Sequence, residues 1–367
     1  MTASLAELTT LRVGGPAARL LEPTTELELV QAAQEAWRDD EWFVLGGGSN
    51  VVVADEGFDG TVIRVGTRGV RRIDGAPEGR VRVRAQAGEP WDALVQLAQH
   101  NGWAGLEALS GIPGSTGAAP IQNIGAYGQE VAQTLAAVDL LDGATGHRVR
   151  VPASDLQLGY RTSALKQGRV AVVIAVEFDL VETTARHKLS APIRYPQLAA
   201  ALEVAVGERA PLGAVREAVL ALRTSKGMVL DPADPDSVSA GSFFTNPIVD
   251  ENVARGLPRD LPRWPVEPEE PPQVLPAGSE PEPRRHPQSY SVKLSAAWLI
   301  ERAGIGRGFA LPGSRAGTSS KHTLAIVNRG GATALEIAQL AAFIQTRVAS
   351  QFGIALHPEP AFVGFEV

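Results

Sequence analysis

Three consecutive glycines, Gly46–Gly48, stand between the hydrophobic runs Trp42–Leu45 and Val51–Val53 and limit the folds open to this chain. A glycine cluster lets main-chain N–H groups approach an anion closely, and it also permits backbone angles that other residues avoid. β-Branched residues and turn signals follow, so we expect a strand, a turn and a strand rather than a helix. A dinucleotide-binding GxGxxG motif must open a helix, and Val51 occupies the place of its third glycine. That fold is therefore excluded, and so is a P-loop, because no Gly-Lys-Ser/Thr follows.

The length and composition indicate a soluble protein of several domains. At 367 residues the chain is too long for one small core, so two or three domains are expected. No apolar run approaches the roughly 20 residues that span a bilayer, and we expect no transmembrane helix. The N-terminus has neither a basic start nor an uninterrupted apolar stretch. A secretory signal is therefore not expected, and the cytoplasm is the default location.

The chain contains no cysteine, which excludes thiol nucleophiles, iron–sulfur clusters and zinc–thiolate sites. Any redox chemistry must therefore use an organic cofactor. The six histidines are scattered without an HExxH pair, so we expect no metal site. A formal net charge of -7 argues against a protein that coats nucleic acid, whereas a local basic cleft for one anionic metabolite remains possible.

Periodic patterns predict helices and strands along the chain. Thr25 and Glu28 have the spacing of a capping box in front of the amphipathic stretch Leu27–Trp37. Further helices are expected at Trp91–His100, Leu212–Arg223, Ser295–Ala303 and Ala332–Gln351, and strands at Trp42–Leu45, 135–151, 170–181 and Thr323–Asn328.

Three stretches have unusual compositions. Residues 61–84 hold seven arginines in alternation with β-formers, a pattern typical of the solvated face of a sheet. Ten of the 26 prolines lie in the span 258–287, which is therefore neither helix nor central strand. Residues 106–128 are rich in Gly, Ala, Ser and Pro and almost free of charge. This suggests backbone packed against a flat group, or else a compact structural loop.

Five separated segments then occur in a fixed order: LGGGSNVVV, GIPGSTGAAPIQNIGAYG, LGYRTSALK, SAGSFFTNP and HPEPAFVG. Together with KLSAAWLIERAG they closely resemble the motifs of the UDP-N-acetylenolpyruvoylglucosamine reductases, flavoenzymes of peptidoglycan precursor synthesis. The resemblance spans nearly the whole chain. It implies an α+β FAD-binding fold of the vanillyl-alcohol-oxidase type, with two FAD-binding subdomains and a C-terminal α+β substrate-binding domain. The implied boundaries are 1–66 for the first subdomain, 67–227 plus 353–367 for the second, and 228–352 for the substrate domain.

The resemblance implies FAD as the cofactor, held non-covalently because no cysteine and no histidine lies in the flavin motifs. The first glycine motif is expected to wrap the diphosphate with main-chain N–H groups, and the second to line the isoalloxazine ring. Thr116 and Ala118–Ala119 stand where a valine and glycines are common in the family, a mild change in packing. The expected FAD contacts are Gly46, Gly47, Gly48, Ser49, Asn50, Ser110, Ile112, Pro113, Gly114, Ser115, Thr116, Gly117, Gln122, Asn123, Gly125, Ala126 and Tyr127.

Three residues are catalytic candidates by their match to the family. Arg161 is expected to hold the substrate carboxylate and to stabilise developing negative charge, a task suited to a permanently charged planar group. Glu359 stands between two prolines on a stiff segment, which suits a fixed carboxyl group. Ser242 is the expected proton donor, although serine in such a place is more often a turn residue that forms hydrogen bonds. For Arg161 and Glu359 the alternative is an ordinary surface charge.

The resemblance also implies four substrate contacts: Tyr195, Lys226, Asn246 and Lys293. The two lysines are suitable counter-charges for a nucleotide diphosphate, with plain surface lysines as the alternative. One form of the family carries a long loop whose tyrosine closes over the substrate, and LSAPIRYPQLAAAL supplies such a segment. Tyr195 is therefore expected to be a lid residue. The C-terminal tail is expected to return to the second subdomain and to bring Glu359 next to the flavin.

The implied reaction is the NADPH-dependent reduction of UDP-N-acetylglucosamine-enolpyruvate to UDP-N-acetylmuramate in two half-reactions, with NADPH as co-substrate. We expect a monomer without nucleic-acid or membrane partners. Two alternatives remain open at this point. A flavin oxidase on the same scaffold would pass electrons to oxygen, and a nucleotide-sugar-binding protein would have no redox activity.

Overall fold

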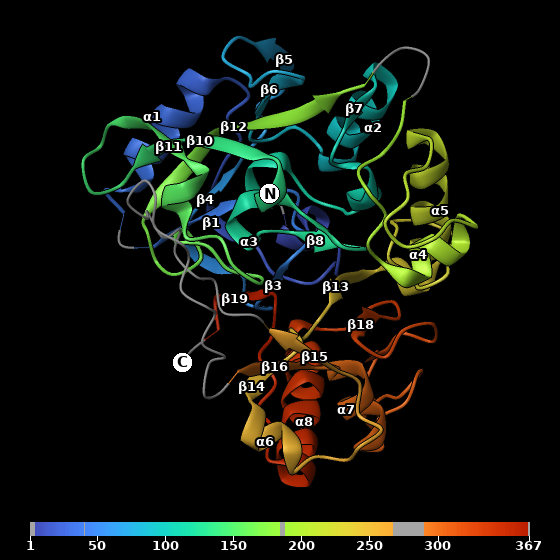
Figure 1. The fold of residues 1–367 in the computed structure, drawn as a ribbon. Helices are drawn as coiled ribbons and strands as arrows, with labels where there is room; N and C mark the ends of the chain where they lie inside the picture. The colour runs from blue at the N-terminus through green and yellow to red at the C-terminus, as the bar shows by residue number, and fades with distance from the viewer. Residues whose placement is uncertain (1–3, 40, 184–187, 267–289, 366–367) are drawn as a thin grey trace.

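The computed structural model describes residues 4–39, 41–183, 188–266 and 290–365. Two sheets lie close together in one half of the molecule, and a third unit built around a long helix lies on the other side (Figure 1). None of the described helices is both long enough and apolar enough to cross a membrane.

A small parallel sheet forms near the N-terminus, in the order β1 (Ala17–Leu21), β4 (Phe58–Arg64) and β2 (Trp42–Leu45). Helix α1 (Glu26–Ala36) joins β1 to β2, and the predicted capping box is confirmed. The Thr25 hydroxyl accepts from the Glu28 N–H at 3.2 Å, and the Glu28 carboxylate accepts from the Thr25 N–H at the same distance. Leu29 and Ala33 of α1 are fully buried in the core that this helix shares with the second sheet.

The second sheet is antiparallel and supplies most of the larger core. Its order is β11 (Arg148–Pro152), β10 (Leu135–Asp142), β12 (Ala171–Glu182), β6 (Arg80–Gln86) and β5 (Val70–Ile73), with β7 (Trp103–Ala104) paired to the end of β12. Helix α2 (Trp91–Asn101) packs against it through Trp91, whose ring meets Phe178 of β12 edge to face at 5.9 Å. A separate small core joins α4 (Pro196–Ala201) to α5 (Leu212–Thr224).

The expected solvated face of arginines is wrong for two of the seven. Arg84 is 7% exposed, and its guanidinium binds Asp139 at 2.5 Å and Glu177 at 3.3 Å. Arg82 binds Asp179 through two hydrogen bonds of 2.7 Å. The reason lies in the register: Glu177 and Asp179 of β12 stand directly opposite Arg84 and Arg82. Carboxylates on the neighbouring strands therefore neutralise these arginines, which the sequence of one strand could not reveal.

The third unit contains two small antiparallel sheets around α8 (Ala334–Phe352). One has the order β13 (Ser239–Ser242), β18 (Ala325–Asn328) and β17 (Ala316–Thr318). The other has the order β14 (Ile248–Asp250), β16 (Ser291–Leu294) and β15 (Arg263–Val266). Helix α7 (Ala296–Arg302) packs on α8 in a core that includes the fully buried Leu299 and Ile344. The proline-rich span contributes only the edge strand β15, and residues 267–287 of that span lie outside the described residues.

The C-terminal tail crosses back to the N-terminal half. Strand β19 (Ala361–Val363) pairs in parallel with β3 (Val51–Val53), the strand that follows the glycine run. We expected the tail to return to the second subdomain; Glu359 of the tail lies beside Arg161, while β19 pairs with a strand that we assigned to the first subdomain. Strand β3 follows the glycine loop and is not part of the sheet β1-β4-β2; it forms a separate two-stranded sheet with β19. The domain boundaries themselves remain a prediction.

The remaining elements are short. They are α3 (Ala119–Gln122), α6 (Glu251–Arg255), β8 (Gly125–Ala126), β9 (Gln129–Glu130) and the 3₁₀ turns η1 (Leu5–Leu8), η2 (Glu107–Leu109), η3 (Thr116–Ala118), η4 (Val131–Gln133), η5 (Ala153–Leu156) and η6 (Pro235–Ser237). Several of them form the loops of the candidate site.

Candidate functional site

The two glycine-rich loops of the sequence lie directly against each other. A Cβ added to Gly47 would stand 2.6 Å from the Cα of Gly114, and one added to Gly46 would stand 2.4 Å from the hydroxyl of Ser115. The Ser49 hydroxyl donates to the Pro113 carbonyl at 3.0 Å. Glycine is thus required in the first loop because the second loop leaves no room for a side chain. The contact brings the two predicted halves of the FAD site together.

The main chain of the first loop presents unused hydrogen-bond donors. Among the described residues, no acceptor is recorded for the N–H groups of residues 46–50. Residue 48 adopts the left-handed conformation, with φ of 63°. Consecutive N–H groups around a left-handed residue form a concave site for anions such as phosphate. This part of the chain therefore fits the diphosphate of FAD.

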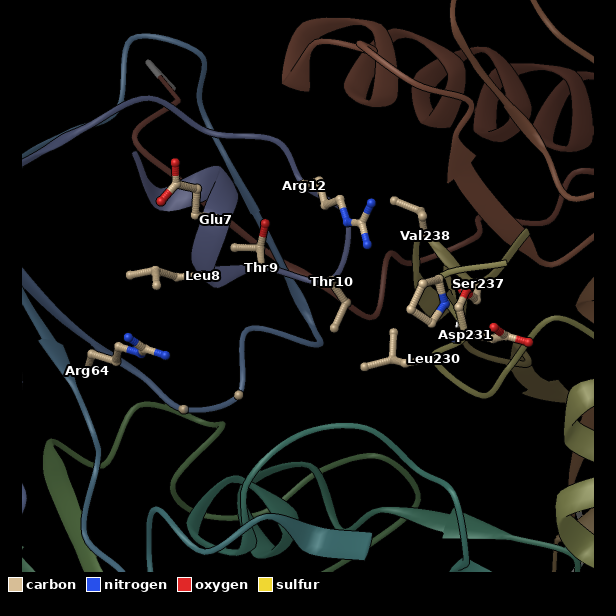
Figure 2. A pocket seen from close by; sticks show the side chains of 13 residues that line it. Glu7, Leu8, Thr9, Thr10, Arg12, Arg64, Leu230, Asp231, Ser237 and Val238 are labelled. Atoms are coloured by element: carbon tan, nitrogen blue, oxygen red, sulfur yellow. Dashed lines mark hydrogen bonds between the residues drawn. The ribbon is translucent and has the colours of Figure 1, made fainter. Parts of the chain in front are cut away.

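Two cavities flank the loop. One of about 360 Å³ lies between the loop, the segment from Glu7 to Arg12 and the segment from Leu230 to Val238. Figure 2 shows Arg12 and Thr10 on one side of it, facing Val238 and Leu230 on the other. The second cavity, of about 430 Å³, lies between the loop and residues 112–115. Both are lined by Gly46, Gly47 and Arg64, so one elongated ligand could pass along the loop.

Two of the catalytic candidates, Arg161 and Glu359, meet although 198 positions separate them, and the third, Ser242, precedes a residue that binds the same tail segment. The Arg161 Nε lies 3.6 Å from the Glu359 carboxylate. The Glu359 N–H donates to the carbonyl of Phe243, the neighbour of Ser242, at 2.9 Å. The Glu359 carbonyl accepts from the Asn50 side chain at 3.2 Å. One short tail segment therefore connects the glycine loop, β13 and the loop that carries Arg161.

Arg161 is held in place by the second glycine-rich loop. Its guanidinium donates to the carbonyls of Asn123 and Gly125, at 3.3 and 2.6 Å. A Cβ on Gly125 would stand 2.9 Å from this guanidinium, so the absence of a side chain there permits the contact. The backbone of Arg161 is left-handed, with φ of 55°. A non-glycine residue in that conformation is uncommon and is often found at functional sites.

Ser242 ends β13, and the structure distinguishes it from Ser239, the serine that begins the same strand. Ser239 is the residue that supports the turn, because its hydroxyl accepts from the Gly241 N–H at 3.1 Å. Gly241 has φ of 74° and so provides the bend before Ser242. No hydrogen bond is recorded for the Ser242 hydroxyl among the described residues. The hydroxyl therefore remains available to a ligand.

The substrate candidates form two separate groups. In the first, the rings of Tyr127 and Tyr195 meet edge to face at 5.5 Å, and the Lys226 ammonium lies 5.6 Å from the Tyr127 ring centre. Tyr127 was expected at the flavin, whereas here it packs beside two substrate candidates. Burial, followed by the charge of Arg223, lowers the pKa of Lys226.

The second group surrounds Tyr160, a residue that sequence reasoning missed although it precedes Arg161 in its motif. The Lys293 ammonium lies 4.9 Å from the centre of the Tyr160 ring. The Tyr160 hydroxyl accepts from the Asn246 N–H at 3.3 Å. Burial raises the pKa of Tyr160. The hydroxyl therefore stays protonated at neutral pH and can donate a hydrogen bond.

Sequence reasoning also assigned no role to His322 or Arg307. Burial, with the charges of Lys226 and Arg307, lowers the pKa of His322 to about 4. Arg307 stands in a glycine-rich turn without a recognisable motif.

Two family models and several known proteins are similar to this chain. The family model described as "UDP-N-acetylenolpyruvoylglucosamine reductase, C-terminal domain" matches residues 232–363, and the one described as "FAD binding domain" matches residues 17–152. A UDP-N-acetylenolpyruvoylglucosamine reductase from Leifsonia xyli is 60% identical over 98% of each chain. One from Saccharopolyspora erythraea is 50% identical over 98% of this chain and 94% of its own. The crystal structure of the Thermus caldophilus enzyme matches with a TM-score of 0.64 at 26% identity, over 99% of this chain and 98% of that one.

Proposed function

The chain belongs to the UDP-N-acetylenolpyruvoylglucosamine reductase family, and we propose that it reduces UDP-N-acetylglucosamine-enolpyruvate with NADPH through Arg161, Ser242 and Glu359. It is an FAD-dependent oxidoreductase of peptidoglycan synthesis. The predicted family, the α+β fold with an FAD-binding region, and the cofactor are thereby confirmed. The roles of the individual residues are our proposal.

The N–H groups of residues 46–50 would hold the diphosphate of FAD, and the loop from Ser110 to Tyr127 would hold its ring system. Bound FAD supplies the redox chemistry, because it can accept hydride from NADPH and pass hydride to the enolpyruvyl group. The contact between Gly47 and Gly114 supports this assignment, since it fixes the two loops relative to each other.

Arg161 stabilises the negative charge that develops on the substrate carboxylate when its neighbouring double bond is reduced. The carbonyls of Asn123 and Gly125 hold its guanidinium in one orientation, so little reorganisation is needed as charge appears. Glu359 lies on the Nε side of the same group. We propose that it helps to stabilise this charge by holding the guanidinium in place through their ion pair.

Ser242 donates the proton that completes the reduction at the ether-bearing carbon. Its hydroxyl is not engaged in a turn, and the hydrogen bond from Glu359 to Phe243 fixes its strand end beside the other two candidates. A neutral hydroxyl suits this task because the enolate carbon is strongly basic, and a positioned acid of this kind contributes about 10²–10⁴-fold to the rate.

The nucleotide diphosphate of the substrate would be bound by side chains from both groups, the one around Tyr127 and the one around Tyr160. Lys226 and Lys293 supply the positive charge, and Asn246 orients Tyr160 between Lys293 and Arg161. Tyr195 is 42% exposed and stands at the start of α4, a position from which a lid residue could reach the substrate. We further propose that the protein acts as a monomer.

The observation that carries the proposal is the connection of Arg161, Glu359 and the end of β13 through one ion pair and one backbone hydrogen bond. Anaerobic NADPH should bleach the flavin absorption band, and the enolpyruvyl substrate added afterwards should restore it with formation of UDP-N-acetylmuramate. Recovery of the band with oxygen but not with this substrate would contradict the assignment and would indicate an oxidase.

A further inference from the structure

Lys166, which has no assigned role in the site described above, holds the side chain of Gln122. Its Nζ donates to the Gln122 Oε1 at 2.5 Å. Gln122 ends α3 in the second glycine-rich loop and is 8% exposed. The contact therefore connects the loop that follows Arg161 to the loop that is expected to line the flavin ring.

The ammonium determines which way the Gln122 amide faces. A lysine ammonium can only donate, so the amide atom in contact with it must be the oxygen, and the NH₂ group must point away. That nitrogen, Nε2, is buried and has no hydrogen-bond partner among the described residues. Buried donors are rarely left unpaired in native proteins, because the loss of water is then not compensated. An acceptor on a bound ligand would satisfy this donor.

The loop that carries Lys166 is anchored to α3 at a second point. The fully buried Ser163 donates its hydroxyl to the Ile121 carbonyl at 2.7 Å and accepts from the Lys166 N–H at 3.2 Å. The backbone of Lys166 is thereby held beside the residue that precedes Gln122. Burial lowers the pKa of Lys166, with the charges of Glu359 and Arg161 acting on it in opposite directions.

We propose that Lys166 is a positioning residue of the flavin site, whose ammonium orients the Gln122 amide so that Nε2 donates to an acceptor atom of the FAD ring system. This inference rests on the FAD-dependent function given above. Without the ammonium, the terminal torsion of Gln122 would be free to rotate, since torsions of this type have broad energy minima. The donor would then be lost for part of the time, and its effect on the electronic state of the ring would weaken.

The test is a double-mutant cycle read out by FAD binding. Apoprotein is titrated with FAD, and the dissociation constant and the visible absorption spectrum are recorded for Lys166→Met, Gln122→Met and the double variant. Each single variant should bind FAD roughly tenfold more weakly, the scale for one lost hydrogen bond, and should shift the flavin band. The double variant should be no weaker than the weaker single variant, because both changes remove the same donor. Lys166→Arg should restore most of the affinity, since a guanidinium also only donates.

Lys188→Met is a control, because the Lys188 ammonium also donates to an oxygen, the carbonyl of His100 at 2.6 Å. It should leave FAD binding unchanged. Wild-type affinity and spectrum in Lys166→Met, or additive losses in the double variant, would overturn the inference. Thermal midpoints of the apoproteins check folding, and the Lys166→Arg variant tests the same contact if Lys166→Met does not fold. A wild-type protein unable to bind FAD would instead contradict the function on which the inference rests.

Discussion

The cofactor side and the substrate side of the site are built in different ways. On the cofactor side, backbone meets backbone: the glycine loop touches residues 113–115 so closely that a methyl group would not fit at Gly47. On the substrate side, long side chains from separate segments meet around Tyr127 and Tyr160, and Tyr195 is 42% exposed. The first region is fixed by packing before any ligand arrives. The second has side chains that can still rearrange when the substrate binds.

The largest expected effect separates proton transfer from hydride transfer. Ser242→Ala should leave bleaching of the flavin band by NADPH intact, and should slow its recovery with the enolpyruvyl substrate by about 10²–10⁴-fold. Only the second half-reaction places a proton on carbon, so only that half should suffer. Stopped-flow absorbance measures both halves.

Ser242→Cys serves as the partial rescue, because a thiol can still donate a proton. Recovery of the band at the wild-type rate in Ser242→Ala would show that the serine only shapes the end of β13.

A change in the rigid region should affect the cofactor before the substrate. In Gly47→Ala the added methyl group would meet the backbone of Gly114 at 2.6 Å and push the two loops apart. We expect FAD to bind at least about tenfold more weakly, with a lower thermal midpoint of the apoprotein. Isothermal titration with FAD measures the affinity.

Gly213→Ala, in α5, is the matched control. Its methyl group would meet only the Gln99 amide nitrogen, at 3.5 Å. Unchanged FAD affinity in Gly47→Ala would mean that the loops tolerate separation and that the close packing has no role in binding.

A change in the adaptable region should have a smaller effect. Tyr195→Phe keeps the ring contact with Tyr127 and removes only the hydroxyl. We expect KM for the nucleotide-sugar substrate to rise about threefold to tenfold, with the NADPH half-reaction unchanged, because a lid residue acts on the substrate alone. Steady-state and single-turnover rates together measure this. Equal effects on both half-reactions would place Tyr195 at the flavin instead.

The smallest expected effect concerns stability in acid. The pKa of His322 is lowered from 6.5 to about 4, so below pH 6.5 the unfolded chain takes up a proton that the folded chain resists. The free energy of unfolding should therefore decrease as the pH falls from 6.5 to about 4. His322→Gln should flatten this part of the pH profile of the thermal midpoint. The exposed His147 provides the control, and identical profiles for His322→Gln and His147→Gln would refute the effect.

Sequence reasoning predicted the parts of the molecule that depend on local pattern. The capping box at Thr25, the helices and the absence of a helix after Gly48 all follow from neighbouring residues, and the structure confirms them. The family motifs also pointed to Arg161 and Glu359, which the structure brings to 3.6 Å.

The features that were missed depend on contacts between distant segments. Arg84 looked like a solvated residue because the carboxylates that bind it are on other strands, Glu177 on β12 and Asp139 on β10. The pairing of β19 with β3 and the hydrogen bond from Lys166 to Gln122 likewise join residues that no shared sequence pattern connects. A periodic pattern identifies a strand or helix, whereas its partner is chosen by the geometry of the whole chain.

The most direct test of the account is a crystal structure of the protein with bound FAD. We predict that the diphosphate oxygens lie within hydrogen-bonding distance of the N–H groups of residues 46–50, with the ring system beside Gln122 and Arg161. The glycines would then serve both the ligand and the contact with Gly114. A diphosphate bound elsewhere, with those N–H groups facing only water, would contradict the account and would show that the glycines serve loop packing alone.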